Sequence, residues 1–280
     1  MVDRRALLRG SLFTMAGAAT AFAGAEPVRH WLGWDRPPLG GGYASAADNL
    51  DAVAHGGVQI HYFRRTEEKL VALTFDDGPL PEYTPQFLDV LDEARVPATF
   101  FVVGRHLDEH AGLVRQRFGR HEVGNHSWSH DDLATLDLAG ARRELERTHD
   151  AIKRHLGREA TLMRPPYGHL GGSTVLAADS MGYDIALWSH QMRERRYAGD
   201  PTAQAQDLID TVRPGAIVLA HDAGDKRRLV ALNALPAMIC ALQEKGYRFV
   251  TVSELLADGP DQARGTRNPE IALSRTGFRT

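Results

Sequence analysis

Short apolar segments alternate with helical segments from Lys69 to Asp258, and this alternation limits the folds open to the chain. Repeated strand–helix units imply parallel strands joined by right-handed crossovers, with helices covering the sheet. Several of the predicted strands are apolar throughout, as strands covered on both faces are. The seven predicted strands are Val71–Phe75, Ala98–Val103, Glu122–Asn125, Leu162–Arg164, Asp184–Trp188, Ala216–Ala220 and Arg248–Thr251.

Single residues mark the ends of the predicted helices. Thr84 is expected as an N-cap, with Pro85 at the first helical position. Glycines are expected to end three later helices, at Gly157, Gly182 and Gly246.

Seven strand–helix units over about 190 residues fit two architectures. One is an incomplete (β/α) barrel and the other is an open doubly wound sheet, and periodicity alone does not separate them. No Gly-rich phosphate fingerprint follows any predicted strand, which weakens the nucleotide-binding version of the open sheet. Because no repeat or linker interrupts this block, we expect a single α/β domain over residues 67–258.

Composition excludes several classes of protein. The 280 residues include 33 Lys+Arg and 36 Asp+Glu, and the formal charge is −3 without a dominant basic block. This balance gives no electrostatic reason to expect a nucleic-acid partner. Cys240 is the only cysteine, so no intrachain disulfide can form.

The first 25 residues have the layout of an export signal. Paired arginines, Arg4 and Arg5, precede an Ala/Gly-rich run, and Ala23–Ala25 offers a small-residue cleavage site. The paired arginines resemble the twin-arginine export type. The alternative is a membrane anchor, but the run is shorter than the ~20 apolar residues that a span needs. We therefore expect an exported protein, extracellular or in the cell envelope, without stable membrane insertion after cleavage.

Two further segments flank the predicted domain. Residues 26–66 are expected to form an N-terminal leader or linker, and residues 259–280 a polar C-terminal tail without a function of its own.

Polar side chains follow four of the predicted strands. Asp76 and Asp77 follow the first, His126 and His130 the third, Arg164 and Tyr167 the fourth, and His221 and Asp222 the sixth. In a barrel, the loops that follow the strands converge on one face, where active sites are built. The sequence therefore predicts a polar site at this face.

Each of these groups has a purely structural interpretation and a chemical one. Adjacent carboxylates repel, so Asp76 and Asp77 either stay solvated in a turn or gain a cation. A His pair spaced by four residues is often incidental, but with a carboxylate His126 and His130 would leave a fourth ligand position open, as in catalytic zinc sites. Arg164 could orient a carboxylate or simply begin a proline-rich connection. His221 could be an acid or base or a capping residue.

Together the four segments resemble the polysaccharide deacetylase family, the NodB homology domain of carbohydrate esterase family 4. The resemblance covers Lys69–Asp258 and rests on Thr-Phe-Asp-Asp-Gly-Pro at 74–79 and His-Ser-Trp-Ser-His at 126–130, followed by Arg-Pro-Pro-Tyr-Gly at 164–168 and Leu-Ala-His-Asp at 219–222. It implies a distorted (β/α)7 barrel.

The resemblance also implies a role for each matching residue. Asp76 would be the general base, steered by Arg164. A divalent metal, most often zinc and otherwise cobalt or nickel, would be held by Asp77, His126 and His130. A backbone N–H at Tyr167 would stabilise the oxyanion, Leu219 would line the acetyl pocket, and His221 would protonate the leaving amine.

One segment departs from the family pattern. Many members carry an Asp-x-x-Asp-Trp segment after the fifth strand, whose carboxylate tunes the catalytic histidine. Here the run is Trp188–Arg196, where only Glu194 or Asp184 could substitute. Trp188 could wall the site or belong to the core. The basic cluster Arg193, Arg195 and Arg196 could contact an anionic glycan or form a solvated face.

The leading expectation is therefore a metal-dependent hydrolase that removes N-acetyl groups from an N-acetylhexosamine polymer of the peptidoglycan or chitin type. The alternatives are an O-deacetylase acting on acetylated xylan or a small ester, and a non-catalytic glycan-binding relative. A serine hydrolase is disfavoured because no Gly-x-Ser-x-Gly elbow occurs.

Overall fold

The computed structural model describes residues 57–257. The predicted export signal at 1–25, most of the predicted linker and the predicted tail at 259–280 lie outside these residues and stay predictions. Within 57–257, no helix combines the length and the apolar character needed to cross a membrane.

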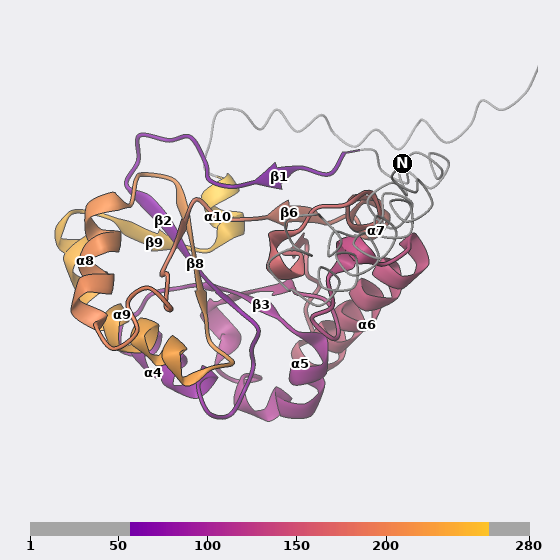
Figure 1. Cartoon of the computed structure of the whole chain (residues 1–280), viewed down its shortest axis with the longest axis horizontal. Helices are drawn as coiled ribbons and strands as arrows, with labels where there is room; N and C mark the ends of the chain where they lie inside the picture. The colour runs from indigo at the N-terminus through magenta and orange to yellow at the C-terminus, as the bar shows by residue number, and fades with distance from the viewer. Residues whose placement is uncertain (1–56, 258–280) are drawn as a thin grey trace, which may run out of the picture.

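The domain is built on one curled sheet of nine strands, and every named strand pair is parallel (Figure 1). The strand order is β1-β6-β5-β4-β3-β2-β8-β7, and β9 pairs with the first half of β2. The strands are β1 Ile60–His61, β2 Leu70–Asp76, β3 Thr99–Val102, β4 Glu122–Asn125, β5 Leu162–Met163, β6 Asp184–Ala186, β7 His190–Gln191, β8 Ala216–His221 and β9 Arg248–Val250. This is the expected distorted barrel, and all seven predicted strands are confirmed.

Helices surround the sheet, with α8 and α9 at one end and α5, α6 and α7 at the other (Figure 1). They are α4 Thr84–Ala94, α5 Gly104–His110, α6 Leu138–Leu156, α7 Gly172–Met181, α8 Pro201–Thr211, α9 Leu229–Glu244 and α10 Val252–Ala257. Short 3-10 turns join them: η2 Ala111–Leu113, η3 Phe118–Arg120, η4 Leu133–Thr135, η5 Pro166–Gly168 and η6 Lys226–Arg228.

The glycine signals for helix ends are confirmed, whereas the capping prediction for Thr84 is wrong. Gly157 and Gly182 adopt the left-handed conformation directly after α6 and α7, and Gly246 follows the end of α9 with a positive φ. At α4 the N-cap is Tyr83, and Thr84 is the first helical residue. The Thr84 hydroxyl does not cap the helix because it bonds the buried carboxylate of Asp222 instead.

Strand β2 lies at the centre of the sheet, and all seven of its residues are buried. Its alternate side chains enter two separate apolar clusters, so both faces are covered. On the outer face Phe75 stacks on Phe100 at 5.1 Å and meets the edge of Phe87 on α4 at 5.2 Å. Packing on both faces fixes the backbone of β2, so the polar residues at its end are held rigidly.

Residues 59–64 take part in the sheet, although composition places them in the linker. The Ile185 N–H donates to the carbonyl of Gln59 at 2.8 Å, and the Arg64 N–H donates to that of Gly215 at 2.8 Å. These bonds extend the sheet to residues that precede position 66 in the chain. The exact start of the domain stays a prediction.

Candidate active site

The polar residues that follow the strands meet at the carboxyl edge of the sheet. Asp76 at the end of β2 is directly paired with His221 at the end of β8, and the Arg164 N–H donates to the carbonyl of Asn125 at 2.9 Å. Because all these strands are parallel, their ends lie at the same edge. The structure therefore brings Asp76, Asp77, His126, His130, Arg164 and His221 to one site.

Arg164 is completely buried and holds Asp76. Its Nη1 donates to Oδ1 of Asp76 at 2.7 Å and to Oγ1 of Thr74 at 2.8 Å. Its other nitrogens donate to the carbonyls of Ala186 and Leu187 at 2.8 and 3.0 Å. Burial lowers the pKa of Arg164, and the charge of Asp76 opposes this. With every side of the guanidinium bonded, Arg164 fixes the orientation of the Asp76 carboxylate.

Asp77, His126 and His130 form a compact three-residue cluster. One ligand atom from each lies within 4.8 Å of the others. Oδ1 of Asp77 is 3.4 Å from Nε2 of His126 and 3.1 Å from Nε2 of His130. Asp77 and His130 adopt positive φ values of 80° and 64°, as does Ser127 between the histidines at 65°. Such conformations cost free energy and concentrate at functional sites.

The donor set of this cluster fits a divalent metal. Nδ1 of His126 lies 2.7 Å from the carbonyl of Arg164. A carbonyl can only accept, so Nδ1 carries a proton, and in the neutral ring that a metal binds Nε2 keeps its lone pair. Oδ1 of Asp77 is buried and receives no hydrogen bond from the described residues. A buried carboxylate oxygen facing two imidazole nitrogens is the ligand set of a catalytic zinc site.

The charge state of Asp77 agrees with a ligand role. Burial alone would raise the pKa of Asp77, but the neighbouring imidazoles of His126 and His130 outweigh it and hold this pKa far below its usual range. The Asp77 carboxylate is therefore ionised at neutral pH.

Two contacts to Asp77 were not predicted. Arg228, at the end of η6, donates from Nη1 to Oδ2 of Asp77 and to the carbonyl of Ala223, the latter at 2.7 Å. Nδ1 of His106 on α5 lies 2.7 Å from the backbone oxygen of Asp77. Arg228 stands among three consecutive basic residues in the sequence, so nothing in the pattern separates it from its neighbours.

The imidazole of His221 has a carboxylate partner. Nδ1 of His221 donates to Oε1 of Glu194 at 2.9 Å, and Glu194 is 9% exposed. Burial would raise the pKa of Glu194, but the bond from His221 and its charge lower this pKa. Of the two candidates named from the sequence, Glu194 is therefore the one that contacts His221.

The structure contradicts the other candidate for this position. Asp184 is the first residue of β6, at the end of the strand away from the site. Its Oδ1 accepts from the N–H of Gln59 at 3.0 Å, and its Oδ2 lies 3.9 Å from Nε2 of His61. Asp184 begins its strand, whereas the site is built from residues at the ends of strands. Asp184 therefore lies away from His221, although it is close to Trp188 in the sequence.

Asp222 is a buried carboxyl that sequence reasoning left without a role. Its Oδ1 accepts from the N–H of Gly78 at 3.2 Å and its Oδ2 from the Thr84 hydroxyl at 2.6 Å. Burial, with a contribution from the charge of Asp77, raises the pKa of Asp222 to about 7. A Cβ at position 78 would overlap the Asp222 carboxylate, so the turn after Asp77 requires glycine. Asp222 therefore anchors the turn that carries Asp76 and Asp77.

The residues expected to shape the substrate groove lie beside this cluster. Tyr167 is 61% exposed, and its ring centroid is 4.9 Å from that of His130. Trp188 packs against Gly168, where an added Cβ would approach the indole to 2.7 Å and φ is +70°. Leu219 is buried in β8, next to the paired residues at the strand end. Trp188 is partly buried and packs against the core, and its role as a wall of the site stays a prediction.

Comparison with known proteins agrees with this geometry. The sequence model described as polysaccharide deacetylase matches residues 63–186. A peptidoglycan-N-acetylglucosamine deacetylase of Bacillus cereus is 37% identical over 200 residues, which cover 68% of this chain and 89% of that protein. A chitooligosaccharide deacetylase of Rhizobium leguminosarum bv. phaseoli is 37% identical over 202 residues, which cover 68% and 87%.

A solved structure shares the fold. The pseudoenzyme BA3943 of Bacillus anthracis, a member of carbohydrate esterase family 4, superposes with a TM-score of 0.65 at 29% identity, covering 71% of this chain and 69% of that one. The sequence matches and the shared parallel half-barrel show that the chain belongs to the polysaccharide deacetylase family.

Proposed function

We propose that this protein is a metal-dependent N-deacetylase of an N-acetylhexosamine polymer of the peptidoglycan or chitin type. The observation that carries the proposal is the pairing of Asp76 with His221 across adjacent strands, beside the Asp77–His126–His130 cluster. A base and an acid then flank the position of a metal, as amide hydrolysis requires.

The residues divide the chemistry between them. A divalent cation, most often zinc in such a ligand set, would activate water and polarise the acetyl carbonyl. Asp76, held by Arg164, accepts a proton from the attacking water. His221, whose Nδ1 bonds to Glu194, gives a proton to the leaving nitrogen. Tyr167 and Trp188 bound the groove, and Leu219 lines the acetyl pocket. Acetate and a free amine result.

The alternatives differ in how well the site supports them. An O-deacetylase would use the same residues, and the names of the two relatives favour an N-acetylated glycan. A non-catalytic role is a real alternative, because BA3943 has this fold and is described as a pseudoenzyme. The complete set of base, acid and metal-ligand candidates favours an enzyme here.

The test is acetate release from chitooligosaccharide, peptidoglycan and acetylated xylan, measured side by side with zinc-loaded protein. Asp76→Asn should lose about 10²–10⁴-fold in turnover, the size of a general-base contribution, and should keep its zinc. Asp184→Asn is the matched control and should keep its activity, since Asp184 lies away from the site. Normal turnover in Asp76→Asn would reject the base assignment.

We also propose that the chain is exported, because residues 1–25 have the layout of a twin-arginine-type signal and the relatives are named for cell-wall glycans. N-terminal sequencing of protein recovered outside the cell should begin after Ala25. An intact Met1 on exported protein would contradict cleavage.

A further inference from the structure

One turn of the chain carries both the partner of His221 and a group of arginines. Met192 is buried, and its N–H donates to the carbonyl of Leu219 at 2.9 Å. Two residues later Glu194 points inward to His221. The side chains around Glu194 are exposed, and all three are basic: Arg193, Arg195 and Arg196. Because Glu194 points inward, the three neighbouring guanidinium groups lie at the surface beside His221, the proposed acid.

A second basic segment faces this turn. Lys226 and Arg227 in η6 are exposed, whereas Arg228 turns inward to Asp77. Ala198 and Gly199, which follow the turn around Glu194, line one cavity together with Lys226 and Arg227, so the two segments are neighbours in the fold. We call the exposed set the basic rim: Arg193, Arg195, Arg196, Lys226 and Arg227.

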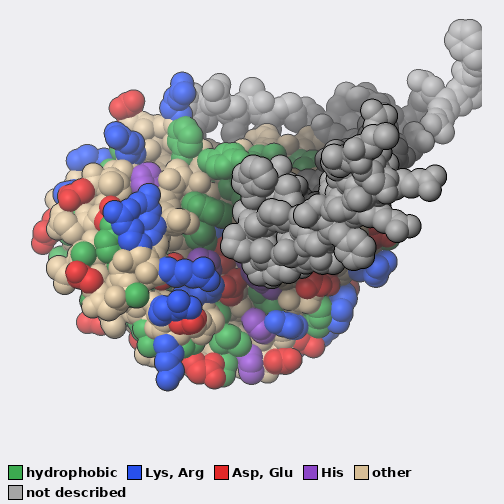
Figure 2. All heavy atoms as spheres, in the orientation of Figure 1, with side chains coloured by type: hydrophobic (Ala, Val, Ile, Leu, Met, Phe, Trp, Pro, Cys, Tyr) green, Lys and Arg blue, Asp and Glu red, His purple; other side chains and the backbone are tan. Residues whose placement is uncertain are grey.

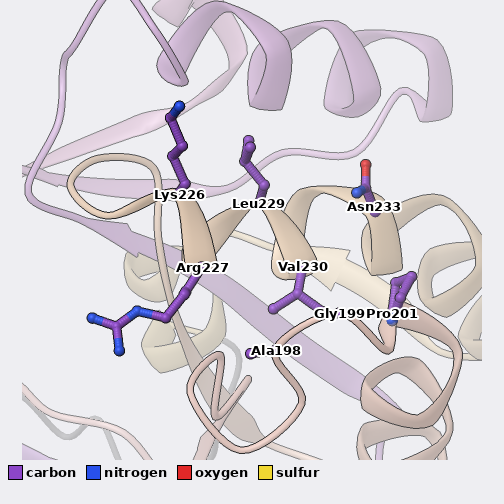
Figure 3. Close-up of a pocket in the computed structure, with 8 residues that line it drawn as sticks. All are labelled: Ala198, Gly199, Pro201, Lys226, Arg227, Leu229, Val230 and Asn233. Atoms are coloured by element: carbon purple, nitrogen blue, oxygen red, sulfur yellow. The ribbon is translucent and has the colours of Figure 1, made fainter.

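A cavity of about 360 Å³ lies next to the basic rim. Its wall is formed by the chain before α8 and by the start of α9, with Leu229, Val230 and Pro201 supplying apolar surface. Lys226 and Arg227 extend outward at its edge (Figure 3). Lysine and arginine side chains gather on this part of the molecule, over α8 and α9 (Figure 2). Lys226 and Arg227 of the basic rim thus line this hollow, and the next residue, Arg228, contacts Asp77 of the site.

The carboxylates of these two segments are already engaged within the described chain. Glu194 is bonded to His221, and Asp225 is bonded to Arg227 through two side-chain contacts of 2.7 and 3.0 Å. No side-chain acceptor is assigned to Arg193 or Lys226 among residues 57–257. Although the chain has a net charge of −3, the basic rim therefore carries a local excess of positive charge beside His221, the proposed acid.

We propose that the basic rim binds carboxylates on the sugar units that flank the acetamido sugar being processed, and so favours an anionic glycan such as peptidoglycan over a neutral N-acetylglucosamine polymer. The proposal rests on the proposed deacetylase function. Charge complementarity is the reason: a carboxylate-bearing strand laid along the site would meet the rim, whereas a neutral polymer offers it nothing.

Three soluble substrates distinguish the effect of the glycan's carboxylates from the effect of its shape. They are peptidoglycan fragments, the same fragments with their carboxylates converted to amides, and chitopentaose. The triple variant Arg193→Gln, Arg195→Gln, Arg196→Gln should raise KM for the unmodified fragments about tenfold, as the loss of a few exposed ion pairs does. Its kcat should be unchanged, as should both constants on the amidated fragments and chitopentaose. For the native enzyme, salt should raise KM on the unmodified fragments alone.

A matched control removes the same charge elsewhere. Arg142→Gln, Arg143→Gln, Arg154→Gln on α6 are exposed substitutions at the other end of the sheet and should leave KM unchanged on all three substrates. If the first triple variant is misfolded by circular dichroism, Lys226→Gln with Arg227→Gln tests the rim from the other segment. Equal KM changes on amidated and unmodified fragments, or none on either, would overturn the proposal.

Failure of the proposed function has a different signature. If the native protein released no acetate from any of these substrates, co-sedimentation with insoluble peptidoglycan would still test the rim. Salt-sensitive binding that is lost in the triple variant, and absent for amidated peptidoglycan, would support the rim. Binding unaffected by the triple substitution would reject it.

Discussion

At the scale of single residues, Asp77 shows how one carboxylate is divided between two kinds of neighbour. Its Oδ1 faces the Nε2 atoms of His126 and His130, while its Oδ2 receives the guanidinium of Arg228. A carboxylate held in this way can offer only Oδ1 to a metal. Arg228 is therefore a positioning residue for the metal ligand in our proposal, and it acts through Asp77.

Replacing Arg228 should weaken metal binding. Loss of a partner that orients a metal-ligating side chain costs about 10–100-fold in metal affinity, so Arg228→Met should lower zinc affinity by at least about tenfold. Competition with a chromophoric chelator measures this on metal-stripped protein without substrate.

The adjacent Arg227 provides the control for this prediction. Arg227→Met removes the same charge from a side chain that pairs with Asp225 at the surface, and zinc affinity should stay as in the native protein. Tighter zinc binding in Arg228→Met would mean that Arg228 repels the cation, and the positioning role would be wrong.

Glu194 should hold the imidazole of His221 in the orientation that the reaction needs. Glu194→Gln replaces the carboxylate that accepts from Nδ1 of His221 by a neutral amide, so turnover should fall about 10–100-fold. Zinc affinity should stay constant. Glu194→Asp should restore part of the activity, and Glu244→Gln, an exposed carboxylate on α9, is the control. Unchanged turnover in Glu194→Gln would reject the positioning role.

Residue patterns predicted the centre of this site but not its supports. Asp76, Asp77, His126 and His130 stand in short, distinctive segments directly after strands, and parallel topology was enough to bring them together. The supporting role of Asp222 depends on Thr84 and Gly78, which lie more than 130 residues earlier in the chain. No local pattern encodes a contact of that range.

At the scale of secondary-structure elements, a buried histidine outside the site lies between η3 and β4. His121 is 3% exposed; its Nδ1 accepts from the N–H of Ala98 at 3.1 Å, and its ring meets those of Phe100 and Phe118 edge-on. Burial lowers the pKa of His121 from 6.5 to about 4. The imidazole of His121 is therefore neutral at pH 7 in the folded protein.

This histidine predicts a loss of stability in weak acid. Between pH 6.5 and about 4, the unfolded chain binds a proton at His121 and the folded chain does not. The contribution is therefore complete above pH 6.5 and is lost as pH falls through this window, by up to about 3 kcal/mol of unfolding free energy. Urea denaturation of metal-stripped protein across this pH range measures it.

Substitution separates this contribution from other titrations. His121→Gln should flatten the decline, although it lowers stability at pH 7 because packing against the phenylalanines is lost. An unchanged slope in His121→Gln would show that His121 is not the titrating group.

Elements were predicted best where they are long and apolar. Strands β2 and β8 could be recognised from unbroken buried runs, and α6 from its apolar spacing and Gly157. The two-residue strands β1 and β7 carry no such period, and they exist only because neighbouring strands offer free hydrogen-bonding groups. Sequence periodicity could not separate a barrel from an open sheet, because both use the same strand–helix unit.

At the scale of the whole molecule, metal binding should stabilise the entire domain. The ligand Asp77 follows β2 directly, and β2 pairs with β3, β8 and β9. Zinc at about 100 times its dissociation constant adds about 2.7 kcal/mol to the free energy of unfolding. For a domain of this size, Tm of metal-stripped protein should then rise by about 5–10 °C.

Calorimetry with and without zinc measures this change. Asp77→Ala should show no rise, whereas Asp210→Ala, an exposed carboxylate on α8, should show the native rise. Chelator should abolish acetate release and zinc should restore it. A full rise in Tm for Asp77→Ala would place the cation elsewhere.

The pairing of β2 with β8 also determines when the site can come into existence. The Thr74 hydroxyl donates to the carbonyl of Val218 across 144 positions of sequence, and Asp76 and His221 close the same ladder. Closing so large a loop is slow, and folds dominated by distant contacts fold slowly. During synthesis, the earlier strand–helix units can collapse while β8 is still missing. Asp76 and His221 can therefore meet only after β8 has been synthesised, and a nascent or truncated chain that lacks β8 lacks the complete site.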